Sequence, residues 1–255
     1  MQERSWQSLT IPNQQGLKLA AVYYAAPDRP RSTLVICHGF TGSKEGGGRV
    51  LEMSEFLAAE LDLDCLAFDF AGHGESQGRF QDMNLSSQLQ DLDSVVGWCL
   101  EHGAPFVMSM GRSFGGSTVL CQAAQDPRVR AICSWAAPAD PYSLLQGMIV
   151  SRDDSQGLIT LGSSEDQVSM RQELFQDLAG FDVPGLAARI APRPLLLVHG
   201  EDDELVPAGD AKRIYASAGQ PKELEIIPGA DHRFSQAYSQ VWRICADWIR
   251  RQVLN

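Results

Sequence analysis

The chain has 255 residues, of which 44% are hydrophobic and 21% are charged. This length and apolar content predict one domain with a sizeable core and exclude disorder as the main state. With 21 basic and 32 acidic residues, the formal net charge is −11. That charge argues against nucleic acid and against anionic membranes as partners, because both are bound through basic surfaces.

The cysteines and the N-terminal residues predict a cytoplasmic protein. The six cysteines are spread along the chain without a CxxC pair, mostly within apolar segments. We therefore expect buried, reduced thiols, and neither a disulfide framework nor a metal site. No run of about 18 apolar residues is present, and residues 1–10 lack the apolar centre of a signal peptide.

Short apolar runs alternate with longer amphipathic stretches along the chain. Strands are predicted for residues 17–24, 33–37, 64–70, 105–110, 129–136, 194–198 and 223–227. Helices are predicted for residues 50–63, 84–102, 113–125 and 238–253. This alternation is typical of βαβ units and predicts an α/β fold with a mostly parallel, doubly wound sheet. Residues 5–24 lack an intervening helix, so we expect an antiparallel hairpin at one sheet edge.

Residues 139–191 interrupt the alternation. Residues 151–156 and 162–167 are polar, residues 170–178 are a candidate helix, and no strand here needs to join the sheet. We interpret the segment as an insertion over the carboxyl ends of the strands, where open α/β sheets bind their ligands. The fold is thereby divided into a core, residues 1–138 and 192–255, and a cap, residues 139–191.

Four apolar residues of this cap are candidates for binding a substrate, although they would serve equally well as the underside that anchors it. They are Leu144, Leu145, Met148 and Ile149.

A GxSxG element is formed by Gly111, Arg112, Ser113, Phe114 and Gly115. Alone this pattern is a weak signal, but here a predicted strand runs into it and a predicted helix leaves it. A sharp strand-to-helix turn needs small flanking residues and presents its serine at a helix N-terminus, where N–H groups stabilise negative charge. Ser113 is therefore the candidate nucleophile.

A serine nucleophile needs a base, and five histidines are available. His102 lies at the end of a predicted helix, and His38 and His199 end predicted strands, so we expect structural roles for these three. His232 stands in the loop after the last predicted strand, at the ligand-binding end of the sheet, and is the candidate base. Composition leaves the acid that would orient it open among the four adjacent residues Glu201–Glu204.

Hydrolysis of an acyl group also requires donors for the negative charge that develops on the carbonyl oxygen. The backbone N–H of Phe114, directly after the serine, is one candidate. The loop after the strand at 33–37 supplies the other, and Phe40 in the run His38–Gly42 is the residue we expect. We also expect the aromatic rings of both residues to line the substrate pocket, with Phe40 as a candidate contact.

These motifs resemble those of the α/β-hydrolase superfamily over nearly the whole chain. They are HGF (38–40), DFAGHGES (69–76), GRSFGG (111–116), HGEDDELVP (199–207) and GADHRFS (229–235), in the expected order. The resemblance implies an eight-stranded α/β-hydrolase sheet and assigns the acid of the HGxxDxxVP pattern to Asp203. DFxGHGxS together with GADHxFS is most similar to small bacterial carboxylesterases, including cinnamoyl and feruloyl esterases. In the second motif we expect Asp69, Gly72, His73, Gly74 and Ser76 to shape a turn.

The resemblance implies a carboxylesterase that uses Ser113, Asp203 and His232 on a small-molecule ester, with no cofactor. A serine peptidase of the aminopeptidase type and a thioesterase are alternatives with the same triad. Dehalogenases and epoxide hydrolases are excluded because they carry an acid where Ser113 stands, and a non-catalytic binding protein is disfavoured because all three residues are present. Oligomeric state is left open, a homodimer being one option.

Overall fold

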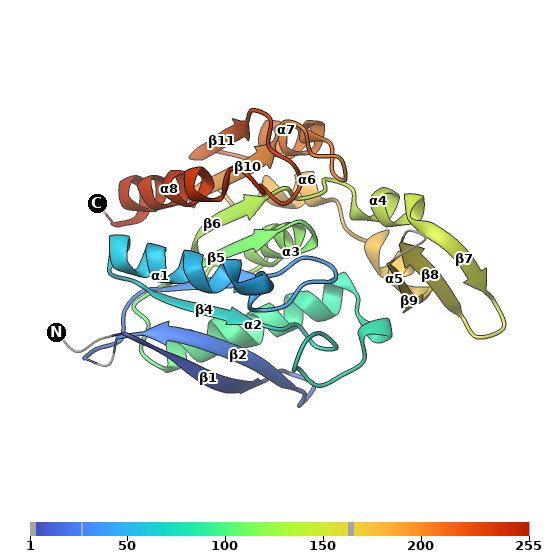
Figure 1. Ribbon diagram of the computed structural model, residues 1–255, viewed down its shortest axis with the longest axis horizontal. Coiled ribbons are helices and arrows are strands. Elements are labelled where there is room, and N and C mark those ends of the chain that lie inside the picture. The colour runs from blue at the N-terminus through green and yellow to red at the C-terminus, as the bar shows by residue number, and fades with distance from the viewer. Residues whose placement is uncertain (1–3, 27, 163–165, 255) are drawn as a thin grey trace.

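Eight strands form one mixed sheet at the centre of the protein (Figure 1). The computed structural model describes residues 4–26, 28–162 and 166–254. The strands are β1 (Ser5–Pro12), β2 (Lys18–Ala25), β3 (Thr33–Cys37), β4 (Asp64–Phe68), β5 (Val107–Arg112), β6 (Val129–Trp135), β10 (Leu195–Gly200) and β11 (Lys222–Ile227). Their order across the sheet is β1-β2-β4-β3-β5-β6-β10-β11. The predicted eight-stranded, doubly wound sheet is confirmed.

The direction of the strands follows the prediction. β1 and β2 form an antiparallel hairpin at one edge, and β2 pairs antiparallel with β4. From β4 onward every neighbouring pair is parallel. β3 and β4 are buried along their whole length, which explains why they read as continuous apolar runs rather than alternating ones.

Helices cover both faces of the sheet, and each face buries its own hydrophobic cluster. Figure 1 shows α1 (Arg49–Leu61) and α8 (Tyr238–Ile249) together on one face. The other face carries α2 (Leu85–Glu101), α3 (Phe114–Ala123) and α7 (Ala208–Ser217), the last of which the apolar pattern did not predict. Short 3-10 helices occur at η1 (Gly46–Gly48) and η2 (Phe80–Asp82), and a π-helical turn, η3 (Arg250–Leu254), follows α8.

The helix ends have local causes. Asn84 begins α2 with a reciprocal capping box, in which its side chain accepts from the Ser87 N–H and the Ser87 hydroxyl accepts from the Asn84 N–H. α1 ends where Asp62 adopts a left-handed conformation with φ of 51°. The six cysteines are buried and unbridged, as expected from the sequence.

The insertion at 139–191 builds a separate three-stranded antiparallel sheet. Its elements are α4 (Pro141–Gly147), β7 (Ile149–Asp153), β8 (Leu158–Gly162), β9 (Gln167–Arg171), α5 (Glu173–Leu178) and α6 (Val183–Ala187). In Figure 1 the small sheet projects beyond the carboxyl ends of β5 and β6. The predicted helix at 170–178 was wrong at its start, because Met170 and Arg171 pair with β8 and only the residues from Glu173 are helical.

Polar contacts attach this insertion to the core. The carboxylate of Asp177, in α5, accepts from the Leu85 N–H at 2.8 Å and from the Ser86 N–H at 3.2 Å. An acceptor at this point satisfies N–H groups that the first turn of α2 leaves free. Arg171 donates to Asp82 at 2.6 Å, which joins β9 to η2.

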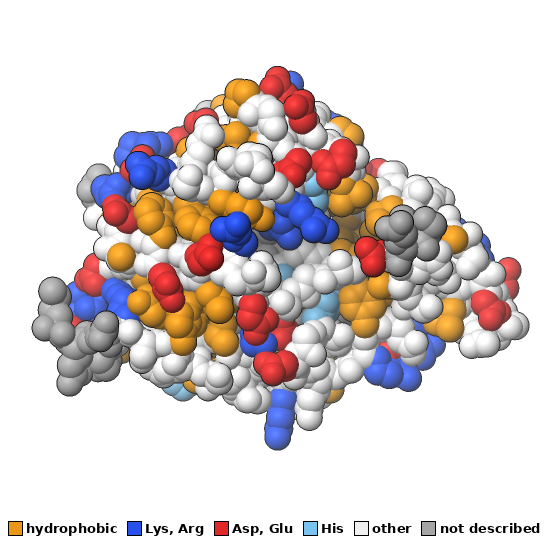
Figure 2. Space-filling model, viewed as in Figure 1, with side chains coloured by type: hydrophobic (Ala, Val, Ile, Leu, Met, Phe, Trp, Pro, Cys, Tyr) orange, Lys and Arg blue, Asp and Glu red, His pale blue; other side chains and the backbone are white. Residues whose placement is uncertain are grey.

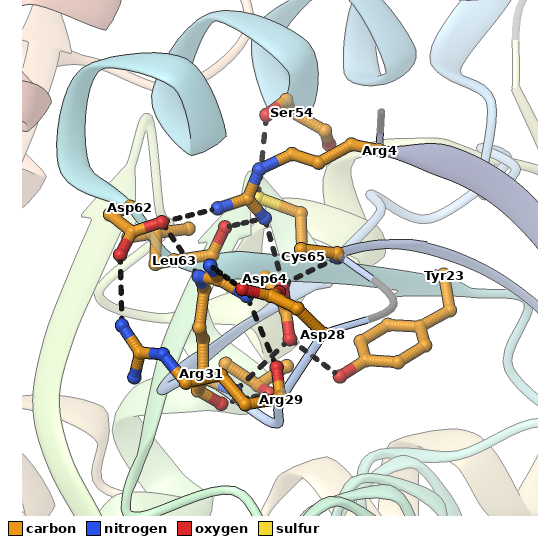
Figure 3. A network of polar contacts seen from close by, with 12 residues as sticks. Arg4, Tyr23, Asp28, Arg29, Arg31, Ser54, Asp62, Leu63, Asp64 and Cys65 are labelled. Carbon is orange, nitrogen blue, oxygen red and sulfur yellow. Dashed lines mark hydrogen bonds and ion pairs between the residues drawn. The ribbon is translucent and has the colours of Figure 1, made fainter. Parts of the chain in front are cut away.

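A network of charged residues joins the N-terminal hairpin to the turn between α1 and β4 (Figure 3). Arg4 donates to Asp62 at 2.9 Å and to Asp64 at 2.8 Å, and the Tyr23 hydroxyl donates to Asp64 at 3.0 Å. The Asp64 side chain is only 1% exposed, so these donors replace the water that the carboxylate loses. Burial, followed by the charge of Asp64, raises the pKa of Tyr23 well above its usual range and keeps the hydroxyl a donor.

None of the helices within the described residues is both long and apolar enough to span a bilayer. In the same part of the chain, no three His, Cys, Asp or Glu side chains are grouped so that they could hold a metal ion.

Candidate active site

Ser113 stands between β5 and α3 in a strained backbone conformation, with φ of 57° and ψ of −125°. A positive φ is uncommon for a residue with a side chain and is a feature of serines on sharp strand-to-helix turns. The two glycines of the motif make the turn sterically feasible. A Cβ at Gly111 would lie 2.1 Å from the Gly115 carbonyl oxygen, and a Cβ at Gly115 would lie 2.2 Å from the His38 carbonyl oxygen.

Ser113, His232 and Asp203 form one hydrogen-bonded chain, although Ser113 and His232 are 119 positions apart in the sequence. His232 Nε2 lies 3.1 Å from the Ser113 hydroxyl oxygen, and His232 Nδ1 lies 2.8 Å from Asp203 Oδ2. Ser113 is 9% exposed and His232 is 7% exposed. The Asp203 side chain is fully buried.

Four donors surround the Asp203 carboxylate. Its Oδ1 accepts from the Leu205 N–H at 2.9 Å and the Val206 N–H at 2.7 Å, while Oδ2 faces His232 and also His199 Nε2, 3.2 Å away. Burial alone would raise the pKa of Asp203, but the hydrogen bonds from His199, His232 and Val206 outweigh it and hold the pKa well below its usual range. The carboxylate is therefore ionised at neutral pH.

An ionised Asp203 determines the tautomer of His232. Because a carboxylate only accepts, Nδ1 must carry the proton that lies between the two groups. Nε2 of the neutral ring is then free to accept the proton of the Ser113 hydroxyl. This is the arrangement that general-base activation of a serine needs.

The other three acids of the cluster differ in position. Glu201, Asp202 and Glu204 are exposed, as expected for a solvated loop. Glu204 makes a 3.3 Å contact with the His232 backbone N–H, so it reaches the histidine's main chain rather than its ring.

The two backbone N–H groups predicted for the oxyanion, those of Phe40 and Phe114, lie on adjacent segments. A Cβ at Gly39 would be only 3.3 Å from the Ser113 Cβ, so the loop that carries Phe40 lies against the serine. The rings of Phe40 and Phe114 are 5.8 Å apart. Within the described residues neither N–H donates to another protein group, and both are available to a ligand.

His73 supports the Phe40 loop, a role that the sequence did not suggest. Its Nε2 lies 2.8 Å from the Phe40 carbonyl oxygen and its ring is 4.8 Å from that of Phe80. The rest of the DFAGHGES segment forms the turn that was expected. Asp69 accepts from the Lys44 and Glu75 backbone N–H groups.

His38 is held as a neutral ring beneath the site. The Phe70 N–H donates to its Nε2 at 3.2 Å, so the proton is on Nδ1, which contacts the Gly39 carbonyl oxygen at 2.8 Å. Burial lowers the pKa of His38 from 6.5 to about 4, and nearby His73 adds to this effect. The predicted structural role at a strand end agrees with these contacts.

This burial predicts an acid-sensitive fold. The unfolded chain takes up a proton at His38 near pH 6.5, whereas the folded protein resists it until about pH 4, so stability rises with pH across this window. The contribution lost between pH 7 and pH 5 is about 2 kcal/mol. Urea unfolding at both pH values should show the difference for the wild type and a smaller one for His38→Asn. His102→Gln, at an exposed helix end, is the control. A difference in unfolding free energy between the two pH values that is as large in His38→Asn as in the wild type would contradict the prediction.

Most of the candidate substrate-binding residues of the insertion pack against the hydrophobic core. Leu145 is 2% exposed in the hydrophobic cluster that covers the α2 and α3 face, and Met148 and Ile149 pack against that cluster, as does Phe40. Leu144 is half-buried on α4. These positions suit the anchoring role, and contact with a substrate remains a prediction for all four and for Phe40.

Comparison with known proteins identifies the family. Residues 34–241 match the model of the Alpha/beta hydrolase family, and the chain belongs to that family. A monoacylglycerol lipase of Mycolicibacterium smegmatis is 26% identical over 250 residues, covering 85% of this chain and 86% of the lipase. The uncharacterized protein YfhR of Escherichia coli O157:H7 is 24% identical over 224 residues, covering 85% of this chain and 69% of YfhR.

Among solved structures, the ferulic acid complex of Est1E from Butyrivibrio proteoclasticus superposes with a TM-score of 0.85. It is 22% identical and covers 97% of this chain and 100% of Est1E. At that identity the likeness supports the fold, which is the same α/β-hydrolase sheet.

Proposed function

We propose that this protein is a serine carboxylesterase that hydrolyses small to medium carboxylic esters. The observation that carries the proposal is the continuous contact from Asp203 through His232 to the Ser113 hydroxyl, at 2.8 and 3.1 Å. The strained backbone at Ser113 supports the same chemistry, as do the Phe40 and Phe114 N–H groups, which donate to none of the described residues. Acyl transfer needs a nucleophile, a base and oxyanion donors, and these groups are our candidates for those roles.

The first half of the reaction forms an acyl-enzyme. His232 Nε2 takes the proton of Ser113 as its oxygen attacks the ester carbonyl carbon, and the N–H groups of Phe40 and Phe114 stabilise the resulting oxyanion. The ionised Asp203 stabilises the imidazolium that forms. Collapse of the intermediate breaks the bond to the alcohol, which leaves with the proton from His232.

The second half releases the acid. Water gives its proton to His232 and attacks the acyl carbon, and Ser113 recovers its proton when the intermediate collapses. All steps use groups of this chain and water. The position of the 139–191 insertion beyond the carboxyl ends of the strands supports its proposed role as the cap that selects the acyl and alcohol groups.

We propose hydroxycinnamoyl esters as one candidate class of substrate. The support is the sequence resemblance of DFAGHGES and GADHRFS, together with a structural neighbour whose title names bound ferulic acid. The lipase relative favours aliphatic esters instead. Both therefore belong in the test.

A substrate panel with the purified protein distinguishes these options. It contains p-nitrophenyl acetate, butyrate and octanoate, methyl ferulate, acyl-CoA thioesters and aminoacyl p-nitroanilides, with Ser113→Ala as the blank. We expect kcat/KM to be highest for an oxygen ester. Turnover of the anilides alone would overturn the esterase proposal in favour of a peptidase, and preference for the acyl-CoA substrates would make the protein a thioesterase.

A further inference from the structure

An apolar hollow lies beside the serine turn on the face of the sheet covered by α1 and α8. About 590 Å³ of space not filled by protein atoms lies within it, part of which is open solvent. Its lining includes Met110 of β5, Trp135 of β6, and Tyr238 and Trp242 of α8. Figure 2 shows basic side chains beside a hollow in the middle of this face, with hydrophobic side chains on either side.

This hollow is separate from the proposed ester-binding side. Side chains alternate along a strand, so Met108, Met110 and Arg112 of β5 point to the same face. Met110 belongs to the hydrophobic cluster on the α1 and α8 face, whereas Phe40 and Phe114 belong with the cluster on the opposite face. Neither the Ser113 chain of contacts nor Phe40 or Phe114 lines the hollow.

Arg112 brings a positive charge into this apolar space. Among the side-chain hydrogen bonds and ion pairs of the described residues, none involves its guanidinium, which faces Tyr238, Arg233 and Asp231 at longer range. Asp231 instead accepts from the Ser235 N–H. Burial, the largest effect, lowers the pKa of Arg112, yet a guanidinium stays charged in proteins. A half-buried charge without a partner is costly, and an anion in the hollow would offset the cost.

The second basic residue at the hollow is already engaged. Arg49 pairs with Glu52 at 3.0 Å and its guanidinium lies 4.7 Å from the centre of the Tyr238 ring. Among the described residues that line the hollow, Arg112 is then the one guanidinium without an ion pair. A single guanidinium in an aromatic-lined space suits a monoanion with a planar, two-oxygen head better than a dianion such as phosphate.

We propose that this hollow binds a small carboxylate with an aromatic or apolar body. Its carboxylate pairs with the guanidinium of Arg112, and its body packs against Trp135, Tyr238 and Trp242. The hollow is distinct from the proposed ester-binding side at Ser113, and its occupancy does not depend on which reaction Ser113 performs.

Fluorine NMR of protein labelled with 5-fluorotryptophan tests the location. Benzoate is the probe and neutral benzamide is the matched control ligand. We expect saturable shifts of the Trp135 and Trp242 resonances with benzoate and weaker ones with benzamide, while Trp6 and Trp98, on β1 and α2, do not move. Trp→Phe variants assign the signals. Equal shifts with both ligands, or no shift at Trp135 and Trp242, would overturn the proposal.

Variants test the recognition. Arg112→Met should weaken benzoate binding about 10- to 100-fold, the loss expected for a charge-assisted pair, and leave benzamide binding unchanged. Arg213→Met, which removes an exposed arginine of α7, should leave both unchanged. Arg112→Lys, which keeps the charge without the planar fork, should retain an intermediate affinity and serves if Arg112→Met does not fold. Ser113→Ala should bind benzoate like the wild type, and loss of benzoate binding in that variant would place the ligand at the Ser113 site instead.

Discussion

Ser113→Ala is expected to lower kcat/KM for ester hydrolysis by on the order of 10³-fold or more while the protein stays folded. The hydroxyl oxygen is the atom that would form the acyl-enzyme, and the described structure places it 3.1 Å from the base. Alanine keeps the Cβ, so it makes no new demand on the positive φ at this position. Steady-state rates with p-nitrophenyl butyrate and a thermal melt measure the two effects.

Ser109→Ala is the matched control for this substitution. Ser109 lies four residues earlier in β5, is fully buried, and its hydroxyl has no hydrogen-bond partner among the described residues. Losing that hydroxyl should leave both activity and melting temperature nearly unchanged. Wild-type activity in Ser113→Ala would move the nucleophile to another residue.

Asp203→Asn is expected to lower kcat by several orders of magnitude, up to about 10⁴-fold. The neutral amide neither stabilises an imidazolium nor holds the His232 proton on Nδ1, so Nε2 loses its role as the base. Both oxygens of the wild-type carboxylate accept hydrogen bonds, so the NH₂ group of asparagine would face a donor in either orientation of the amide. The folded protein should therefore also be less stable.

Asp202→Asn is its neighbouring control. Asp202 is exposed, and we expect kcat to change by no more than about 2-fold, as for a surface substitution. Rates of both variants under saturating substrate, with folding checked by circular dichroism, decide the assignment. Full activity in Asp203→Asn together with a large loss in Asp202→Asn would transfer the acid to position 202.

The parts of the fold that depend on local pattern were predictable. The continuous apolar runs at β3 and β4 and the helical spacing in α2 mark elements that bury most of their surface, and the structure has them within one or two residues at most ends. α7 was not predicted, since only Ala211 and Ile214 of its ten residues are buried. β7 is exposed along most of its length and carries little alternation, so its polar residues read as a loop.

The candidate site divides in the same way. Ser113 and His232 could be located from their motifs, because Ser113 directly follows the apolar strand β5 and His232 stands in the loop after the last strand, β11. The second contact of Asp203, to His199 at 3.2 Å, and the contact of His73 with the Phe40 carbonyl oxygen could not. Each contact joins two segments through a single pair of atoms. The local sequence around His199 or His73 is the same whether or not its ring reaches such a partner.

The sequence by itself determined the class of fold, the order of the strands along the chain and the turn that presents Ser113, because these follow from apolar periodicity and from where glycine is required. Composition alone left the acid open among four neighbours, the family resemblance pointed to Asp203, and the tertiary structure shows Asp203 facing His232. Only the tertiary structure decided that Arg112 lines an apolar hollow and forms no ion pair with any described residue. The reason is physical. Hydrogen bonds and ion pairs act over about 3 Å between groups that the chain separates by tens of residues, and only the packed sheet brings them to that distance.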